Sequence, residues 1–170
     1  MTRPRARTIA AAVFVALVVI AAAAAWSMSA PPVAPEQPIA FHHRDHVATD
    51  RLDCELCHSG VRRSAFAGVP PVERCMGCHR VVVPEHPDVM KLRRYYEAGK
   101  AVPWVKVNSL PRFVRFNHEA HTLAGVSCGA CHGDVASMDR VARVAPLTMG
   151  WCVGCHRGAH APDDCLTCHY

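Results

Sequence analysis

The hydrophobic residues of this chain are concentrated near its N-terminus. An apolar run extends from Ile9 to about Met28, interrupted only by Ser27, and it follows three arginines within the first seven residues. Because a helix of about 20 apolar residues can cross a hydrocarbon core, residues 1–28 predict cytoplasmic arginines followed by a transmembrane anchor. A cleaved signal peptide is the alternative, since small residues surround Ser27. In both cases we expect the rest of the chain on the periplasmic side of the cytoplasmic (inner) membrane, attached in a single pass if the anchor is retained.

Beyond this run the pattern predicts only short elements. Four prolines between positions 29 and 38 favour an extended linker over residues 29–40. Pro87 begins a predicted helix that ends near Ala98 and is closed by Gly99. Residues 102–107 and 112–116 are expected to be extended. The chain after the linker is therefore predicted to be mostly irregular, with short α-helices.

The ten cysteines explain this scarcity of elements. All of them fall in five copies of the pentapeptide Cys-x-x-Cys-His, which is typical of c-type heme attachment. Two thiols about one helical turn apart can bond to the two vinyl groups of one porphyrin, and the next imidazole then reaches the iron as its proximal ligand. The cysteines are Cys54 and Cys57, Cys75 and Cys78, Cys128 and Cys131, Cys152 and Cys155, and Cys165 and Cys168; the proximal histidines are His58, His79, His132, His156 and His169.

Zinc is the alternative ligand of paired cysteines, because two Cys-x-x-Cys pairs can form a ribbon site. Five pairs leave one pair over, and zinc does not account for the five trailing histidines. Five covalently bound c-type hemes, in contrast, would supply the apolar bulk for the 130 residues that follow the linker. We therefore predict short helices and loops wrapped around five hemes.

An internal repeat divides the heme-binding part. The segment Phe41–His46 aligns with Phe116–His121 at an offset of 75 residues, and two heme motifs follow each copy. Such duplication indicates two similar structural units. The predicted order is two diheme modules at residues 41–80 and 116–157, a connector at 81–115 between them, and a fifth heme site at 158–170.

Each module opens with Phe-x-His-x-x-His, which supplies candidate distal ligands. Histidines three residues apart project from one side of a helical turn and can reach two different irons. Surface histidines are the alternative reading, but the duplication favours ligands. His42 aligns with Asn117 and is not expected to be one. The four predicted distal ligands are His43, His46, His118 and His121.

The fifth iron has no ligand assigned by the repeat. Met149 lies three residues before Cys152, and a thioether ligand there would raise the reduction potential relative to paired histidines. His160 lies five residues before Cys165. His86, flanked by prolines, is a further candidate, and an iron without a sixth ligand is also open.

The formal net charge of +5 does not indicate a nucleic-acid partner. Three of these charges are the N-terminal arginines, and five hemes would add about ten propionates. The heme-binding part is therefore expected to be near neutral or acidic, with no nucleic acid bound.

The motifs resemble those of the cytochrome c3/c7 superfamily, in which Phe-x-His-x-x-His precedes Cys-x-x-Cys-His. Three longer stretches, residues 70–79, 96–105 and 146–152, are similar to the pentaheme subunits of bacterial alternative complex III. The resemblance covers most of residues 38–157. A related quinone reductase complex of sulfate reducers carries a similar subunit. One departure is the short segment between the fourth and fifth motifs, residues 157–164, which is much longer in that family.

The resemblance implies a c3/c7-like multiheme cytochrome c that relays electrons in a respiratory chain. Its partners would be other membrane and periplasmic subunits of a quinol-oxidising complex, with an iron–sulfur subunit as donor and a monoheme cytochrome c or an oxidase as acceptor. On its own the chain is then not an enzyme and has no catalytic residue. Two alternatives remain open: a single-anchor multiheme quinol dehydrogenase, and a multiheme reductase with one open iron.

Overall fold

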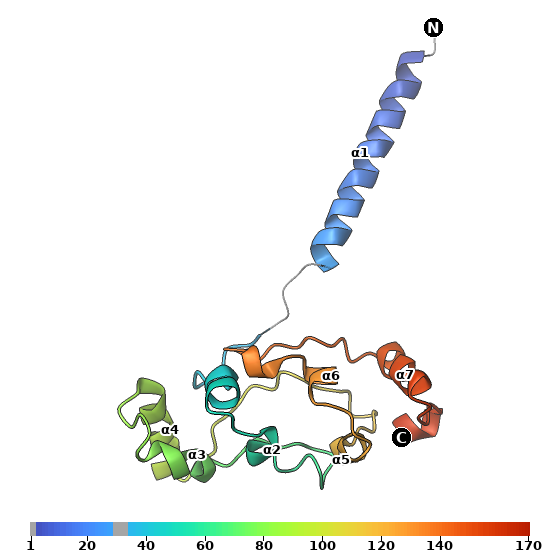
Figure 1. Cartoon of the computed structure of the whole chain (residues 1–170). Helices are drawn as coiled ribbons and strands as arrows, with labels where there is room; N and C mark the ends of the chain where they lie inside the picture. The colour runs from blue at the N-terminus through green and yellow to red at the C-terminus, as the bar shows by residue number, and fades with distance from the viewer. Residues whose placement is uncertain (1–2, 29–33) are drawn as a thin grey trace. The chain divides into compact units, whose positions relative to one another are not determined.

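The computed structural model describes residues 3–28 and 34–170, with side chains for residues 8–23 and 34–170. The chain divides into two compact units, Met1–Pro32 and Val33–Tyr170. The first contains helix α1, Arg3–Met28, and the second contains all five Cys-x-x-Cys-His motifs (Figure 1). The expected linker, residues 29–40, falls partly outside the described residues.

The apolar run predicted to be a membrane anchor lies in α1. Its described large side chains are exposed, including Ile9, Phe14 and Ile20. Among the residues that the structure describes, no helix is both long enough and apolar enough to cross a membrane.

The second unit consists of short helices joined by irregular segments, as the sequence predicts. In the described part of the chain, β pairing is limited to one isolated bridge between Val114 and His169, so the expected extended segments form no sheet. The predicted helix after Pro87 is confirmed, and Gly99 follows it with a left-handed φ of 62°. The elements are η1 (Arg44–Thr49, a π-helical turn), α2 (Cys54–Cys57), α3 (Val72–His79), α4 (Pro87–Glu97), α5 (His118–Leu123), α6 (Gly129–His132), η2 (Val135–Ser137, a 3₁₀ turn), α7 (Met149–Gly158) and α8 (Cys165–Cys168).

Polar residues start several of the motif helices. Asp53 precedes α2 and its carboxylate accepts a hydrogen bond from the Glu55 backbone at 2.7 Å. Asp164 precedes α8 and accepts from two backbone N–H groups at 3.0 Å. Thr148 caps α7 in the same way. These caps satisfy the free N–H groups at a helix start and so fix where each short motif helix begins.

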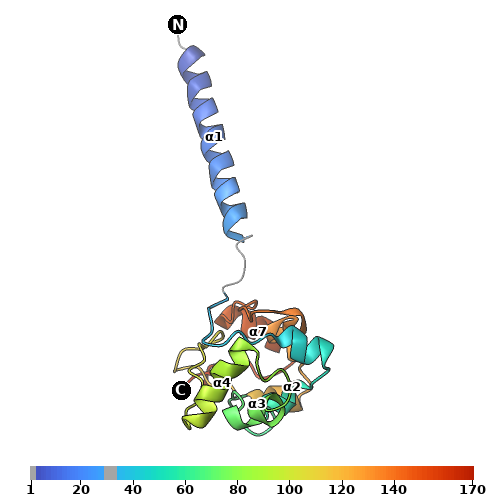
Figure 2. The same ribbon diagram turned by 90° about the vertical axis from the view of Figure 1, so that its left-hand side faces the viewer.

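The protein core of this unit is small and lies at one end. Met76 of α3 and Leu92 of α4 are buried together with Ile39, Val72 and Val102. Helices α3 and α4 lie side by side in both views (Figures 1 and 2). The connector therefore covers the second heme motif, and its tyrosines and Trp104 pack partly buried against this core.

The C-terminal end of the predicted linker is fixed to the connector. The Gln37 side chain donates to the Val105 carbonyl and accepts from the Val105 N–H, both at 2.9 Å. Ile39 follows it into the core at 6% exposure. This part of the linker is thus built into the second unit and does not act as a free spacer.

The two predicted modules dock on each other reciprocally. The Arg44 N–H of module 1 donates to the Met138 carbonyl of module 2, and its guanidinium pairs with Asp139 at 2.9 Å. In return, the Glu119 N–H of module 2 donates to the Ser64 carbonyl of module 1 at 3.2 Å. Each distal-histidine turn therefore rests on the loop that follows the first heme motif of the other module.

Gly133, which follows the third motif, is a position where we expect substitution to be costly. Its φ and ψ of 70° and −163° lie in a region essentially restricted to glycine. A Cβ there would also meet the Val144 side chain at 2.9 Å. We expect Gly133→Ala to lower the free energy of unfolding by about 1–3 kcal/mol, measured by denaturant titration of the heme-loaded chain.

The matched control is Gly154→Ala, because Gly154 is helical and a Cβ built there meets nothing within 4 Å. Equal stability of the Gly133→Ala and wild-type chains would contradict this interpretation of the backbone.

Candidate heme sites

All five predicted proximal histidines have a partner at Nδ1. In four of them the partner is a backbone carbonyl, so Nδ1 carries the proton and donates it. A neutral imidazole protonated at Nδ1 has its Nε2 lone pair free for a metal. The partners are Gly68 for His58 (2.7 Å), Val82 for His79 (3.1 Å), Pro162 for His156 (2.5 Å) and Phe113 for His169 (3.3 Å), and the Asn108 side-chain amide for His132 (3.2 Å).

The two Phe-x-His-x-x-His segments place their histidines alike. Phe116 packs edge-on against His118, with ring centroids 4.8 Å apart, and nearly face-on against His121 at 4.7 Å. Phe41 makes the same two contacts in module 1. The aromatic ring thus fixes both imidazoles, so that they point toward different heme motifs.

Hydrogen bonds fix three of these four imidazoles further. The Nδ1–H of His46 donates to the His42 carbonyl at 3.0 Å, and that of His121 to the Asn117 carbonyl at 2.8 Å. The His118 Nδ1–H donates across the module boundary to the Ala65 carbonyl, also at 2.8 Å. The Nδ1 atom of the fourth imidazole, that of His43, is buried and has no hydrogen-bond partner.

The structure brings each predicted distal histidine opposite a different proximal one. Two imidazoles bound through Nε2 to opposite sides of one metal, with bonds of about 2 Å, have ring centroids about 6 Å apart. The observed separations match this spacing, so the residues fit four hemes with paired histidine ligands. The pairs are His43–His58 (6.5 Å, planes 6° apart), His46–His79 (5.9 Å, 61°), His118–His132 (6.4 Å, 7°) and His121–His156 (5.9 Å, 55°).

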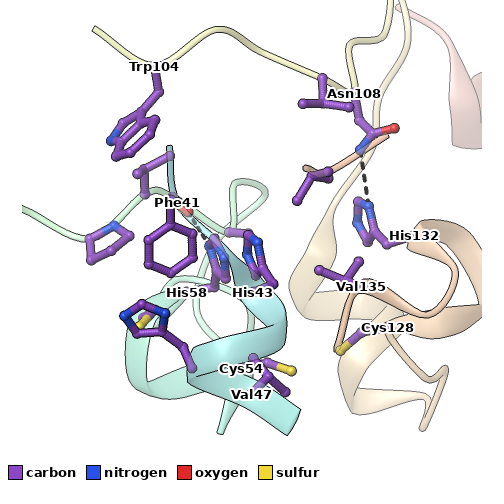
Figure 3. A pocket seen from close by; sticks show the side chains of 18 of the residues that line it. Phe41, His43, Val47, Cys54, His58, Trp104, Asn108, Cys128, His132 and Val135 are labelled. Atoms are coloured by element: carbon purple, nitrogen blue, oxygen red, sulfur yellow. Dashed lines mark hydrogen bonds between the residues drawn. The ribbon is translucent and has the colours of Figure 1, made fainter. Parts of the chain in front are cut away.

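The imidazoles of the first and third motifs line one large cavity. Figure 3 shows Cys54 and Cys128 within it, together with His43, His58 and His132. Its volume of about 1520 Å³ exceeds the ~300–1,000 Å³ of ordinary ligand pockets. The histidine pairs and thiols on its wall are those that covalent heme binding requires, and its size fits more than one cofactor.

Burial keeps two of these imidazoles neutral. It lowers the pKa of His43 to about 4, and the neighbouring His58 and His46 lower it further. Burial also lowers the pKa of His132, with His118 next in effect. A neutral imidazole is the form that binds a metal, so this environment suits ligation.

The five motifs are not arranged in their sequence order. Burial raises the pKa of Cys54, Cys75, Cys131 and Cys152 above the usual value of a thiol, and a nearby thiol of another motif raises each pKa further. In Figure 1 the helices α3, α2, α6 and α7 correspondingly follow one another across the unit. The neighbouring thiols are Cys75 and Cys57, Cys54 and Cys128, Cys131 and Cys155, and Cys152 and Cys168. The order along the row is second, first, third, fourth, fifth.

The fifth motif has a different environment. The Arg115 N–H donates to the Cys168 carbonyl at 2.8 Å, and its guanidinium lies 4.4 Å from the Tyr170 ring centroid. The His169 ring lies 5.9 Å from that of Phe113, and no histidine ring of the described residues is recorded opposite it. The segment before Phe116 therefore holds the fifth motif in place.

The three candidates for the sixth ligand of this iron are placed differently. Met149 begins α7 and is 68% exposed. His160 is exposed, with a left-handed φ of 53°. His86 caps α4, and its Nδ1 accepts the Asp88 N–H at 3.3 Å. Because His86 then carries its proton on Nε2, it is the least suited of the three to bind a metal through Nε2.

Residues 114–170 match the family model described as cytochrome c7 and related cytochrome c. Over 161 residues the chain is 30% identical to the menaquinone reductase multiheme cytochrome c subunit of Nitratidesulfovibrio vulgaris (strain Hildenborough), covering 79% of this chain and 77% of that protein. The chain belongs to the multiheme cytochrome c family. Covalently bound c-type heme is the cofactor of this family, and the Cys-x-x-Cys-His motifs are where a multiheme cytochrome carries it.

The sequence motifs do not predict two kinds of residue that orient the histidines of this multiheme cytochrome. Asn108 is in the connector, 24 residues from His132, and no pattern marks it. The carbonyls of Gly68 and Ala65 act through the backbone, so their residue types carry no signal. Phe41 and Phe116 are different, because both belong to the repeat. Their packing against the two histidines that follow them could have been inferred from it.

Proposed function

We propose that this multiheme cytochrome binds five hemes and relays electrons within a respiratory complex that exchanges electrons with the quinone pool. Heme iron held by two imidazoles cycles between ferric and ferrous states without an open coordination site. The observation that carries the proposal is that four of the five motifs have a second histidine opposite the proximal one.

The protein residues have three tasks in this role. The ten cysteines would anchor the cofactors covalently, and hydrogen bonds at Nδ1 orient the five proximal imidazoles and three of the four distal ones, with Nε2 available to the iron. The reciprocal contacts between modules keep the first and third motifs adjacent. A rigid arrangement of this kind suits electron transfer, which requires little movement of the protein.

The finer proposal is a subunit of alternative complex III. It rests on the three stretches at residues 70–79, 96–105 and 146–152, and the relative named as a menaquinone reductase subunit supports a quinone-linked complex in general. The donor would be an iron–sulfur subunit, and the acceptor a monoheme cytochrome or an oxidase. Purification from the native membrane, with identification of the accompanying subunits, tests this assignment.

We also propose that the heme domain is exported and held at the cytoplasmic membrane. The support is the sequence: three arginines, the apolar run to Met28 and the requirement of c-type heme attachment for an exported site. The mass of the mature N-terminus distinguishes a retained anchor from a cleaved signal. Recovery of the intact chain in the cytoplasm would contradict both.

Mass spectrometry and electron paramagnetic resonance (EPR) of the purified chain test the function itself. The intact mass should exceed that of the polypeptide by five hemes. Low-spin ferric signals should fall into two classes, because the angle between axial imidazole planes sets how the iron d orbitals split. The imidazole planes are nearly parallel in two histidine pairs, at 6° and 7°, and crossed in the other two, at 61° and 55°.

The same spectra separate the competing functions. A high-spin iron whose signal changes with nitrite or sulfite would indicate a reductase with an open iron, which would have to be at the fifth motif. Direct oxidation of a quinol by the isolated chain would indicate a quinol dehydrogenase. Fewer than five hemes would contradict the proposed row.

A further inference from the structure

Asn108 occupies a position that backbone carbonyls occupy elsewhere in this molecule. The proximal imidazoles of the other four motifs each donate Nδ1–H to a main-chain oxygen, at 2.5–3.3 Å. The Nδ1 of His132, in the third motif, instead lies 3.2 Å from the side-chain amide nitrogen Nδ2 of Asn108 (Figure 3). Both residues are half-buried, so water competes weakly for the contact.

The corresponding loop in module 2 does not supply the carbonyl. In module 1 the partner of His58 is Gly68, ten residues further along the chain. After His132, the left-handed Gly133 turns the chain against Val144, and the partner comes from the connector instead. The third motif is therefore the one whose proximal partner can be removed by a single side-chain substitution.

The orientation of the amide follows from the ligand role of His132. When Nε2 binds a metal, Nδ1 carries the proton and must donate it. The oxygen and nitrogen ends of an asparagine amide exchange by a half-turn of the group. In the heme-loaded chain Asn108 therefore presents Oδ1 to His132 and accepts this proton.

We propose that Asn108 is a positioning residue that lowers the reduction potential of the heme at the third motif. This inference rests on the proposed heme-binding function. An acceptor at Nδ1–H makes an imidazole a stronger donor to the metal, which stabilises the ferric state. The distal ligand His118 also has an acceptor, whereas its counterpart His43 at the first motif has none. The third heme thus has two such acceptors and the adjacent first heme has one, so the two central hemes differ in potential, the third being the lower.

Redox titration of the full-length heme-loaded chain, followed by EPR, tests this proposal. Asn108→Leu removes the acceptor and should raise one midpoint potential, whereas Asn108→Asp supplies a charged acceptor and should lower the same one. We expect each shift to be about 59 mV, a tenfold change in the oxidised-to-reduced ratio of that heme at a fixed potential. The signal that moves should belong to the class with near-parallel imidazole planes, because the planes of His118 and His132 differ by 7°.

Gln37→Leu is the matched control. It removes an amide that holds the same connector through Val105, three residues before Asn108, and that hydrogen-bonds to no histidine among the described residues. It should leave every midpoint potential in place. An equal shift in this control, shifts of the same sign in both Asn108 variants, or no shift in either would overturn the proposal.

The intact mass of each variant distinguishes failure of the proposed heme-binding function from failure of the proposed role of Asn108. Loss of a heme from the wild-type chain would contradict the proposed function itself. A five-heme chain with unchanged potentials in both variants would contradict only the role of Asn108. If Asn108→Leu loses its third heme, Asn108→Asp retains an acceptor, and the sign of its shift decides alone.

Discussion

Replacement of His46 by alanine is expected to convert one of the five proposed hemes from low spin to high spin. Its ring lies 5.9 Å from that of His79, and no other histidine ring among the described residues is paired with His79. Without it the second iron would lose its sixth ligand and take up water or an added ligand. The measurements are EPR of the ferric chain, which should gain a high-spin signal, and carbon monoxide binding to the ferrous chain.

His42 provides a close control for this substitution. It lies four residues before His46, its Nδ1 is 3.5 Å from an Asp45 carboxylate oxygen, and within the described part of the chain its ring is paired with no proximal histidine. His42→Ala also keeps the backbone carbonyl that accepts the His46 Nδ1 proton. Its spectra should match those of the wild-type chain. A high-spin signal from His42→Ala and none from His46→Ala would exchange the two roles and refute the assignment.

Loss of the first heme motif is expected to disrupt the row more than loss of the second. Cys54→Ser with Cys57→Ser removes the attachment of the proposed heme of the first motif, and this motif lies between the second and the third. The second heme would then be separated from the remaining three. Rapid reduction of this variant, followed optically, should show a separate slow phase with the amplitude of one heme.

The double substitution Cys75→Ser and Cys78→Ser is the comparison. It removes a heme at the end of the row, so the remaining four stay contiguous and should equilibrate in one phase. Intact masses must first show four hemes in each variant. The opposite pattern of phases would mean that the hemes follow the order of the sequence instead.

The motifs made much of the site predictable, because covalent attachment and ligation depend on residue type and short spacing. Cys-x-x-Cys-His marks each attachment point, and the repeat singles out His43 and His118 together with their partners three residues later. The repeat also distinguishes His42 from the four ligands, since the residue aligned with His42 in the second copy is Asn117. The structure places each of these four imidazoles opposite a heme motif, a relation that spacing alone does not determine.

The spatial order of the motifs could not be predicted, because it depends on contacts distant in sequence. The Arg44 N–H meets the Met138 carbonyl, and Thr122 donates to the Val61 carbonyl 61 residues away. These contacts place the first motif beside the third. Asn108 was missed for the same reason, since its partner lies on another element.

The helix from Pro87 was predictable because its signals are local. Pro87 suits the first turn, Asp88 favours the positive end of the helix, and Gly99 accepts the left-handed turn that follows. What the helix covers was not predictable. Leu92 packs on Met76 of α3, so the connector covers the second motif.

The exchange of contacts between the modules bears on how this chain arose. Each module completes the other, as two copies do across the two-fold axis of a homodimer. A single ancestral diheme unit with these contacts would have paired with a second copy, and duplication with fusion would have joined the two subunits in one chain. The two halves now differ at one matched position, because His118 has an acceptor on the neighbouring half and His43 has none. If so, separately produced halves carrying their hemes should associate, which sedimentation can measure.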